Sequence, residues 1–207
     1  MFKAFYLSKK AILESLQEER GDINDPTPPA MGMVIGKFSP LTIGHKKMID
    51  QLIAACKQHD LVPVVAIIDV GGLNDTDRLL TGDERKQIIQ TAYSDVEVMV
   101  TANAFQALVN IKETGGDLGL LVCGDDRVEK YRDLSLKIFD KDYQDFPPDV
   151  KALSRSDADD PASLASSTKA RQAASTGDIK AFAAIVGQPS QQAEPLMQLL
   201  RDRMGMD

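Results

Sequence analysis

The chain has 207 residues and a formal net charge of −7, with 43% hydrophobic and 27% charged residues. This length and composition are ordinary for a soluble globular protein with one substantial core. The acidic balance argues against general nucleic-acid binding, which needs a broad basic surface. We find no stretch that resembles a membrane span or a cleavable signal peptide, so we expect an intracellular, cytoplasmic protein with no membrane partner.

Strand and helix patterns alternate along the middle of the chain. In chain order we predict a strand at 33–35, a helix at 43–59, a strand at 61–68, a helix at 82–93, a strand at 96–100, a helix at 103–113 and a strand at 118–123. Continuous apolar runs such as 61–68 are typical of strands buried in parallel sheets. The alternation predicts an α/β fold with a Rossmann-like, doubly wound parallel sheet, in which the loops after the strands meet at one edge.

The two ends of the chain look like short helical extensions of a single domain. Residues 1–30 contain an amphipathic helix pattern followed by a proline-rich linker, and we assign the central domain to residues 31–187. Residues 188–207 predict a C-terminal helix whose leucines are a candidate contact for a homo-oligomer. Residues 127–165 are too irregular for an assignment.

Several residues of types that can serve in catalysis or metal binding are better explained here by ordinary structural roles. Cys56 and Cys123 lie in apolar surroundings, which favours buried thiols over a disulfide or a metal pair. His59 stands in a polar stretch and is expected at the surface. Thr81 and Glu84 have the spacing of a helix capping box, and we interpret them as structural.

The most informative segment is Gly36-Lys-Phe-Ser-Pro-Leu-Thr-Ile-Gly-His45, which follows the first predicted strand. The two glycines allow close approach of a ligand or a backbone, and Pro40 stiffens the loop between them. If a helix begins near Thr42, then Thr42 and His45 share its first turn, where unpaired N–H groups and the helix dipole favour anions. The segment therefore predicts a phosphate-binding loop in which both side chains reach one phosphate oxygen.

Four blocks, in order, resemble the nucleotidyltransferases that carry a (His/Thr)-x-Gly-His loop. The blocks are Thr42-Ile-Gly-His45, Leu79-Leu-Thr-Gly-Asp-Glu-Arg85, Leu120-Leu-Val-Cys-Gly-Asp-Asp126 and Ala165-Ser-Ser-Thr-Lys-Ala-Arg171. The last block resembles the family's Ile-Ser-Ser-Thr-x-x-Arg, with Ala165 in place of the usual isoleucine. One block alone is a weak signal, but four in order over residues 31–187 identify the superfamily.

The resemblance implies transfer of a nucleotidyl group and suggests the residues that perform it. His45 would donate to the α- or β-phosphate, Thr42 would add a neutral donor, Lys37 would contact phosphate and Arg171 would neutralise the leaving pyrophosphate. Ser167 and Thr168 would hold the β- and γ-phosphates, whereas Lys169 is a weaker candidate. The expected nucleotide-binding residues are Gly36, Phe38, Gly44, Gly124, Asp125, Ser166, Ser167 and Thr168.

The same resemblance implies Mg²⁺ bound with ATP, held mainly by phosphate oxygens and water, and we expect no dedicated metal cluster. The Gly-Lys-Phe-x-Pro-Leu opening is similar to nicotinamide mononucleotide adenylyltransferases, and Pro-x-Thr-x-Gly-His is similar to phosphopantetheine adenylyltransferases. We favour adenylyl transfer from ATP, with nicotinamide mononucleotide narrowly ahead as the acceptor. A CTP-dependent cytidylyltransferase, a non-catalytic nucleotide-binding module and a fragment related to class I aminoacyl-tRNA synthetases remain as alternatives.

Overall fold

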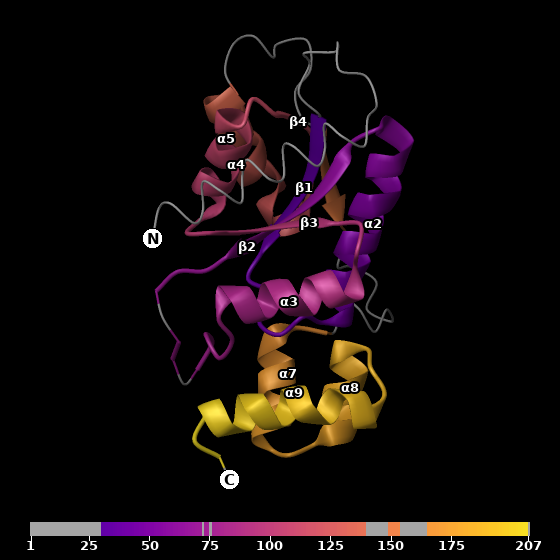
Figure 1. Ribbon diagram of the computed structural model, residues 1–207, viewed down its shortest axis with the longest axis vertical. Coiled ribbons are helices and arrows are strands. Elements are labelled where there is room, and N and C mark those ends of the chain that lie inside the picture. Colours follow the sequence, from indigo (N-terminus) through magenta and orange to yellow (C-terminus); the bar gives the residue numbers. More distant parts are fainter. Residues whose placement is uncertain (1–29, 72, 75, 140–148, 154–164, 207) are drawn as a thin grey trace.

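The computed structural model describes residues 30–71, 73–74, 76–139, 149–153 and 165–206. The predicted N-terminal helix and the linker before Ala30 lie outside the described residues. Alternating strands and helices make up the described chain (Figure 1). They are β1 (Ala30–Gly36), α2 (Ile43–His59), β2 (Val62–Ile68), α3 (Gly82–Ala92), β3 (Glu97–Thr101), α4 (Ala104–Glu113), β4 (Asp117–Gly124), a 3₁₀ turn (Asp125–Arg127), α5 (Val128–Phe139), β5 (Asp149–Leu153), α7 (Ser167–Ser175), α8 (Ile179–Val186) and α9 (Ser190–Arg203).

All seven strands and helices predicted between residues 33 and 123 are present, and the α/β fold class is confirmed. The region that resisted assignment contains α5 and β5. Helix α5 buries Tyr131, Ser135 and Ile138 on one face, and the serine in the middle of that face interrupts its apolar period. None of the described helices has the length and apolar character needed to cross a membrane.

The five strands form one parallel sheet in the order β3-β2-β1-β4-β5. The central strand β1 places Val34 opposite Val65 of β2 and Val122 of β4. After β1 the chain builds one half of the sheet, and it then crosses to the other side of β1 to build the second half. Such a reversal leaves a crevice at the carboxyl ends of the two strands that flank it, here β1 and β4, where open α/β sheets bind their ligands.

Helices cover both faces of the sheet and bury a core on each. On one face α4 and α5 pack on the strands around Met33, Val64 and Leu108. On the other face α2 and α3 pack on the strands around Val34, Ile49 and Ile89. Helix α2 approaches β1 closely because Gly32 has no Cβ, and a Cβ there would collide with the side chains of Cys56 and Leu52 on α2. This close contact holds the C-terminal half of α2 against the first half of β1.

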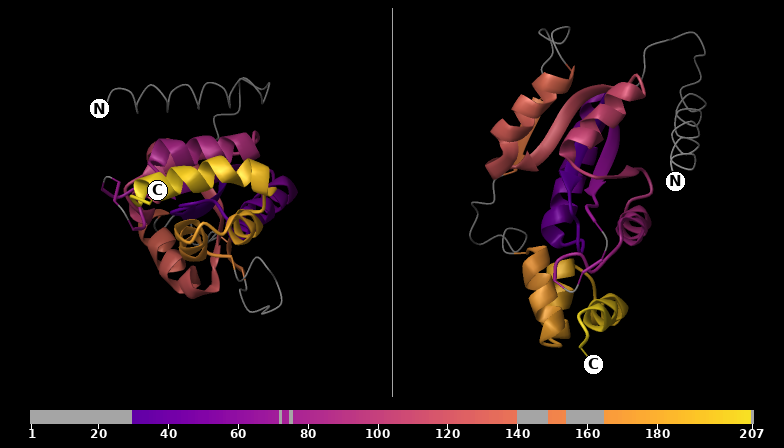
Figure 2. Two further views of the ribbon diagram at one scale, coloured as in Figure 1. Left: turned by 90° about the horizontal axis from the view of Figure 1, so that it is seen from below. Right: turned by 90° about the vertical axis from the view of Figure 1, so that its left-hand side faces the viewer.

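Helices α7, α8 and α9 pack together as a separate cluster beyond one end of the sheet (Figure 1), which we call the three-helix unit. They lie together at one end of the molecule, next to α3, in Figure 1 and in the right-hand view of Figure 2. Their shared core includes Phe182 and Leu200, and the leucines at 196 and 199 pack against it. The apolar face of α9, which was a candidate oligomer contact, is therefore covered within the chain.

Candidate active site

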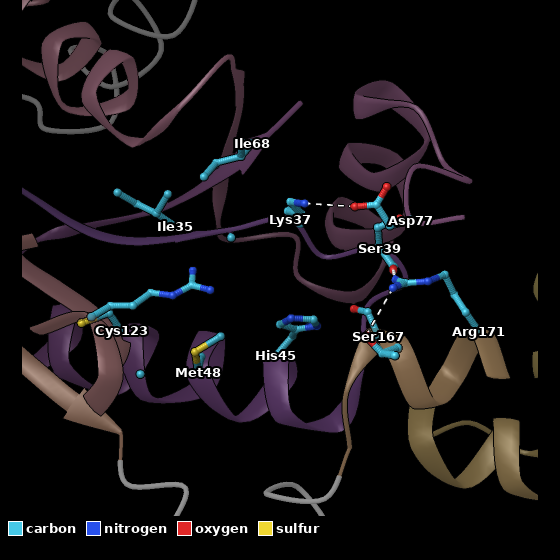
Figure 3. Close-up of a pocket in the computed structure, with 14 residues that line it drawn as sticks. Ile35, Lys37, Ser39, His45, Met48, Ile68, Asp77, Cys123, Ser167 and Arg171 are labelled. Carbon is cyan, nitrogen blue, oxygen red and sulfur yellow. Dashed lines mark hydrogen bonds and ion pairs between the residues drawn. The ribbon is translucent and has the colours of Figure 1, made fainter. Parts of the chain in front are cut away.

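A cavity of about 410 Å³ opens at the crevice between β1 and β4. The end of β1, the end of β4 and the first turns of α2 and α7 surround it (Figure 3). Its lining consists of Ile35, Gly36, Lys37, Ser39, His45, Met48, Ile68, Asp77, Cys123, Gly124, Arg127, Ser167, Thr168 and Arg171. The first and last of the four sequence blocks thus meet in one cavity, although more than a hundred residues separate them in the chain.

The loop after β1 shapes the floor of this cavity. Phe38 takes a left-handed backbone conformation with φ of 51°, which is uncommon for a residue with a bulky side chain. Its ring is 1% exposed and lies with its centroid 5.0 Å from that of His45, at 60°. Gly36 leaves room for the ring, since a Cβ there would stand 3.1 Å from it. Phe38 thus packs beside His45 rather than lining the cavity as a nucleotide contact.

His45 is oriented by the N-terminus of α2. Thr42 is the N-cap of this helix, as predicted, and its backbone N–H donates to His45 Nδ1 over 3.2 Å. The Thr42 hydroxyl lies 3.2 Å from the same nitrogen. A neutral imidazole that accepts at Nδ1 carries its proton on Nε2, so the ring is set to donate through Nε2. The ring itself lines the cavity.

In this arrangement the Thr42 side chain has a different role from the one expected. Its side chain is 1% exposed and contacts His45, whereas the sequence suggested that both side chains would reach the same phosphate. The reason is the three-residue spacing on a helix, which brings the two side chains into contact with each other. Gly44 belongs to the first turn of α2 and is not part of the cavity lining.

Lys37 reaches the cavity from the loop after β1. Its Nζ forms an ion pair of 3.2 Å with Asp77, a residue that no sequence pattern had singled out. The Asn74 amide donates to Asp77 over 3.0 Å, and this bond, with help from Lys37, holds the pKa of Asp77 below its usual range. The ion pair brings the ammonium group of Lys37 next to Asp77 at the cavity.

The backbone of Lys37 is held by a buried arginine. Arg85 is 3% exposed, and its Nη1 donates to the Lys37 carbonyl over 2.6 Å and to the Ile68 carbonyl over 2.9 Å. It also pairs with Asp69, so its charge is compensated. Arg85 belongs to the second sequence block, but only the fold reveals that it ties the ends of β1 and β2 together.

Helix α7 brings the last sequence block to the cavity. Ser166 is its N-cap, and the Ser166 hydroxyl accepts from the Lys169 N–H over 3.2 Å. Ser167 donates to the Pro40 carbonyl over 3.0 Å. Arg171 donates to the Ser39 carbonyl over 2.8 Å and reaches the Thr168 hydroxyl over 3.3 Å. Helix α7 is thus bonded directly to the loop that carries the first motif.

The end of β4 supplies the opposite wall. Gly124 lines the cavity as predicted, and Arg127 lines it from the 3₁₀ turn that follows. The side chain of Asp125 lies outside what the structure describes. Arg127 was missed, although its place three residues after the predicted Gly124 is the signal that could have pointed to it. In Figure 3 the His45 ring lies between Cys123 and Met48 on one side and Ser167 and Arg171 on the other.

The charges around the cavity suit an anion. Lys37, Arg127 and Arg171 line it, and Asp77 is the one carboxylate among the described lining residues. Two helix N-termini add oriented N–H groups and positive dipole ends. No cluster of three or more metal-binding side chains occurs in the part of the chain that the structure describes. The cavity is thus a local basic site in an acidic protein.

Comparison with known families agrees with this geometry. The sequence model of the cytidylyltransferase-like family matches residues 33–182, which include most of the described chain. The chain belongs to the cytidylyltransferase-like family. Members of this family, as the four blocks imply, are nucleotidyltransferases. No curated protein sequence matches the chain.

Solved structures share the fold of this family member. Nicotinic acid mononucleotide adenylyltransferase of Plasmodium falciparum, complexed with NaAD, is 14% identical with a TM-score of 0.58, and the match covers 83% of this chain and 97% of that one. A bifunctional NMN adenylyltransferase/ADP ribose pyrophosphatase of Francisella tularensis, complexed with AMP and a manganese ion, is 14% identical with a TM-score of 0.54, over 86% and 52% of the two chains.

A third structure is described as a macrolide-efflux protein from Streptococcus pneumoniae. It is 18% identical with a TM-score of 0.54, and the match covers 79% of this chain and 58% of that one. The cytidylyltransferase-like chain thus spans little more than half the length of two of these three proteins. At these identities the three likenesses establish a common fold.

Proposed function

We propose that this protein is a nucleotidyltransferase that moves an AMP unit from ATP to a phosphorylated acceptor and releases pyrophosphate. One observation carries the proposal: His45 on α2 and Arg171 on α7 line the same cavity, each in the first turns of a helix whose N-terminus faces it. A triphosphate needs several cations and N–H groups along its length, and this cavity offers them from separate elements.

The reaction would be a direct displacement at the α-phosphorus. An oxygen of the acceptor phosphate attacks that phosphorus, the bond to the β-phosphate oxygen breaks, and the electron pair leaves with pyrophosphate. Nε2–H of His45 would donate to a non-bridging phosphate oxygen as negative charge grows there. Lys37 and Arg171 would neutralise the pyrophosphate, and backbone N–H groups of α7 would bind its oxygens. Positioning and charge stabilisation suffice, since no covalent intermediate is needed.

The hydroxyl of Ser167 has a more limited part in this scheme than the sequence suggested. Its proton is donated to the Pro40 carbonyl, so its role is to hold α7 against the motif loop. The hydroxyl of Thr168, which is more exposed, and the N–H groups of the first turn of α7 are then the neutral phosphate donors at this end.

A divalent cation would enter with the nucleotide. Asp77 is already bonded to Asn74 and Lys37, and it is a single carboxylate, so the residues present fit a metal held by phosphate oxygens and water rather than by the protein. Bound in this way, Mg²⁺ would reduce the charge of the triphosphate. The manganese ion and AMP in the Francisella protein are consistent with such use of a divalent cation.

For the acceptor we favour nicotinamide mononucleotide or its nicotinic acid counterpart. The Gly-Lys-Phe-Ser-Pro-Leu opening supports this choice, and two proteins of similar fold act on mononucleotides of this kind according to their descriptions. Phosphopantetheine adenylyltransferase and CTP-dependent cytidylyltransferase are the alternatives within the family. A nucleotide-binding module without catalysis is the alternative outside it.

Pyrophosphate release tests the proposal. The purified protein with Mg²⁺ is supplied with ATP or CTP, each crossed with nicotinamide mononucleotide, nicotinic acid mononucleotide, phosphopantetheine or phosphocholine. We expect release with ATP and a pyridine mononucleotide, and loss of about 10²- to 10³-fold in kcat for His45→Ala, as when an oxyanion donor is removed. His59→Ala is the matched control, because His59 is exposed at the far end of the same helix. Triphosphate binding without release from any pair would contradict catalysis and favour the binding module.

A further inference from the structure

Arg203, in the last turn of α9, is bonded to the N-terminus of α3. Its Nη1 donates to Glu84 Oε2 and its Nη2 to Glu84 Oε1, both over 2.6 Å. Nη1 also donates to the Leu79 carbonyl over 2.6 Å. This bidentate pairing fixes both the distance and the orientation of the Glu84 carboxylate relative to the Arg203 guanidinium. Arg203 lies beyond residue 182, where the match to the family ends, so the family resemblance assigns it no role.

The partners of Arg203 belong to residues 77–85, which we call the bridge. Leu79 and Leu80 are 0% and 1% exposed and lie in the core of the three-helix unit. Glu84 also accepts from the Thr81 N–H over 2.8 Å, as the predicted capping box requires. The bridge is thus anchored in the three-helix unit by buried side chains and by Arg203.

The other contacts of the bridge lead to the phosphate-binding loop. Asp77, at one end of the bridge, pairs with the Lys37 ammonium group over 3.2 Å. Arg85, at the other end, donates to the Lys37 carbonyl over 2.6 Å. Both the side chain and the main chain of Lys37 therefore depend on where the bridge lies, and Arg203 sets one of its attachment points.

We propose that Arg203 is a positioning residue for the triphosphate site, acting through the bridge on Lys37. The inference rests on the proposed function, because it takes Lys37 as a ligand of the nucleotide. Without Arg203, Glu84 and the Leu79 carbonyl lose their shared partner, and the bridge gains freedom relative to the three-helix unit. Because the contacts of the bridge converge on Lys37, the expected result is weaker binding of the triphosphate while the acceptor is little affected.

Arg201 provides a matched control on the same turn of α9. Its Nη1 donates to the Ala174 carbonyl over 2.9 Å and to the Ser175 carbonyl over 3.4 Å, which are contacts with α7 inside the three-helix unit. Arg201→Met and Arg203→Met remove the same kind of side chain from the same helix. A general loosening of the three-helix unit would appear in both variants, whereas loss of the bridge contact would appear only in the second.

The experiment measures KM for MgATP and for the acceptor, and the dissociation constant of MgATP by calorimetry, in wild type, R203M, R203K, R201M, K37M and the double variant K37M/R203M. We expect R203M to raise KM and the dissociation constant for MgATP about tenfold, below the roughly hundredfold cost of a 1 Å misplacement. R203K should recover part of this loss, and R201M should stay within about twofold of wild type. In the K37M background the further effect of R203M should nearly vanish, since both changes act on one interaction.

Two results would overturn the inference: equal losses in R201M and R203M, or an R203M effect that persists in full without the Lys37 side chain. Different results would contradict the proposed function. A wild-type protein that binds MgATP but releases no pyrophosphate contradicts catalysis alone, and the inference is then judged on the dissociation constants. A wild-type protein that does not bind MgATP overturns both.

Discussion

The guanidinium group of Arg171 donates to the carbonyl oxygen of Ser39 over 2.8 Å, although 132 positions separate the two residues in the chain. This bond joins α7 to the loop after β1, so the two motifs of the cavity are tethered to each other. It also uses only part of the guanidinium, which has five N–H donors. Arg171 can therefore support the loop and contact a phosphate at the same time.

Replacing Arg171 should weaken both of these functions. We expect Arg171→Met to lower kcat/KM for the nucleotide by about 10²-fold, because a charge-assisted contact and the tether to Ser39 are lost together. Arg171→Lys should recover only part of this, since a compact ammonium group lacks the planar fork with which a guanidinium reaches two separate partners. Lys169→Met is the control, because Lys169 is exposed on the same helix and is not among the residues that line the cavity. Steady-state kinetics with varied nucleotide gives the answer, and an equal loss in the control would contradict the role of Arg171.

The Thr42→Val variant distinguishes two roles for the Thr42 hydroxyl, which are orienting the His45 ring and donating a hydrogen bond to phosphate. The variant keeps the backbone N–H that bonds His45 Nδ1 and removes only the buried hydroxyl. If the hydroxyl merely supports the ring, kcat should fall by roughly three- to tenfold, as for the loss of one neutral hydrogen bond. If Thr42 instead donates to the transition state, the loss should approach 10²- to 10³-fold. The comparison of kcat for this variant with that for His45→Ala decides between the two.

Arg127 should contribute to binding although no sequence pattern pointed to it. Arg127→Gln removes one of the three cations that line the cavity, and we expect kcat/KM to fall about tenfold, the size of one partly exposed charge contact. Arg132→Gln is a closely matched control. Both side chains are 47% exposed, but Arg132 pairs with Glu129 on α5 and is not part of the lining. The dependence of the rate on each substrate would show which anion Arg127 contacts, and no change in either KM would exclude it from the site.

The pair of Glu84 and Arg203 should make stability depend on pH in acid. The hydrogen bond from Arg203 is the main reason that the pKa of Glu84 lies at about 2 in the folded protein, below its ordinary value of 4.5. Because the folded pKa is depressed, this contribution is present in full above about pH 5 and is lost as the pH falls toward 2. Between these limits the unfolded chain binds the proton more readily than the folded one.

Urea unfolding at pH 6.5 and pH 3 measures this dependence. Wild type should lose more unfolding free energy between the two conditions than Glu84→Gln, which has no carboxylate to titrate at this position. Glu129→Gln is the control, because its pair with Arg132 is exposed and should contribute little. An identical loss in wild type and Glu84→Gln would show that Glu84 does not contribute to acid stability.

Much of the fold was predictable because its determinants are local. The helix from Ile43 to His59 follows from an apolar residue every three or four positions, and its start at Thr42 follows from the capping preference of threonine. The apolar run that forms β2 is a strand pattern whatever lies beside it. The phosphate-binding loop, its histidine and the serine-threonine block at 165–171 were likewise visible, since their residue types and spacing are properties of short segments.

The remaining parts of the site depend on contacts between segments that are distant in the chain. Asp77 meets Lys37, Arg85 holds the Lys37 carbonyl, and Arg203 reaches Glu84 across 119 positions. No sequence pattern shows these pairings, because the two partners of each lie far apart in the chain. Sequence by itself determined the strands, the helix starts and the chemistry of the two motifs, because hydrogen bonding and apolar periodicity act over a few residues. Only the tertiary structure decided which polar side chains surround the cavity, because packing of the sheet against the three-helix unit brings them together.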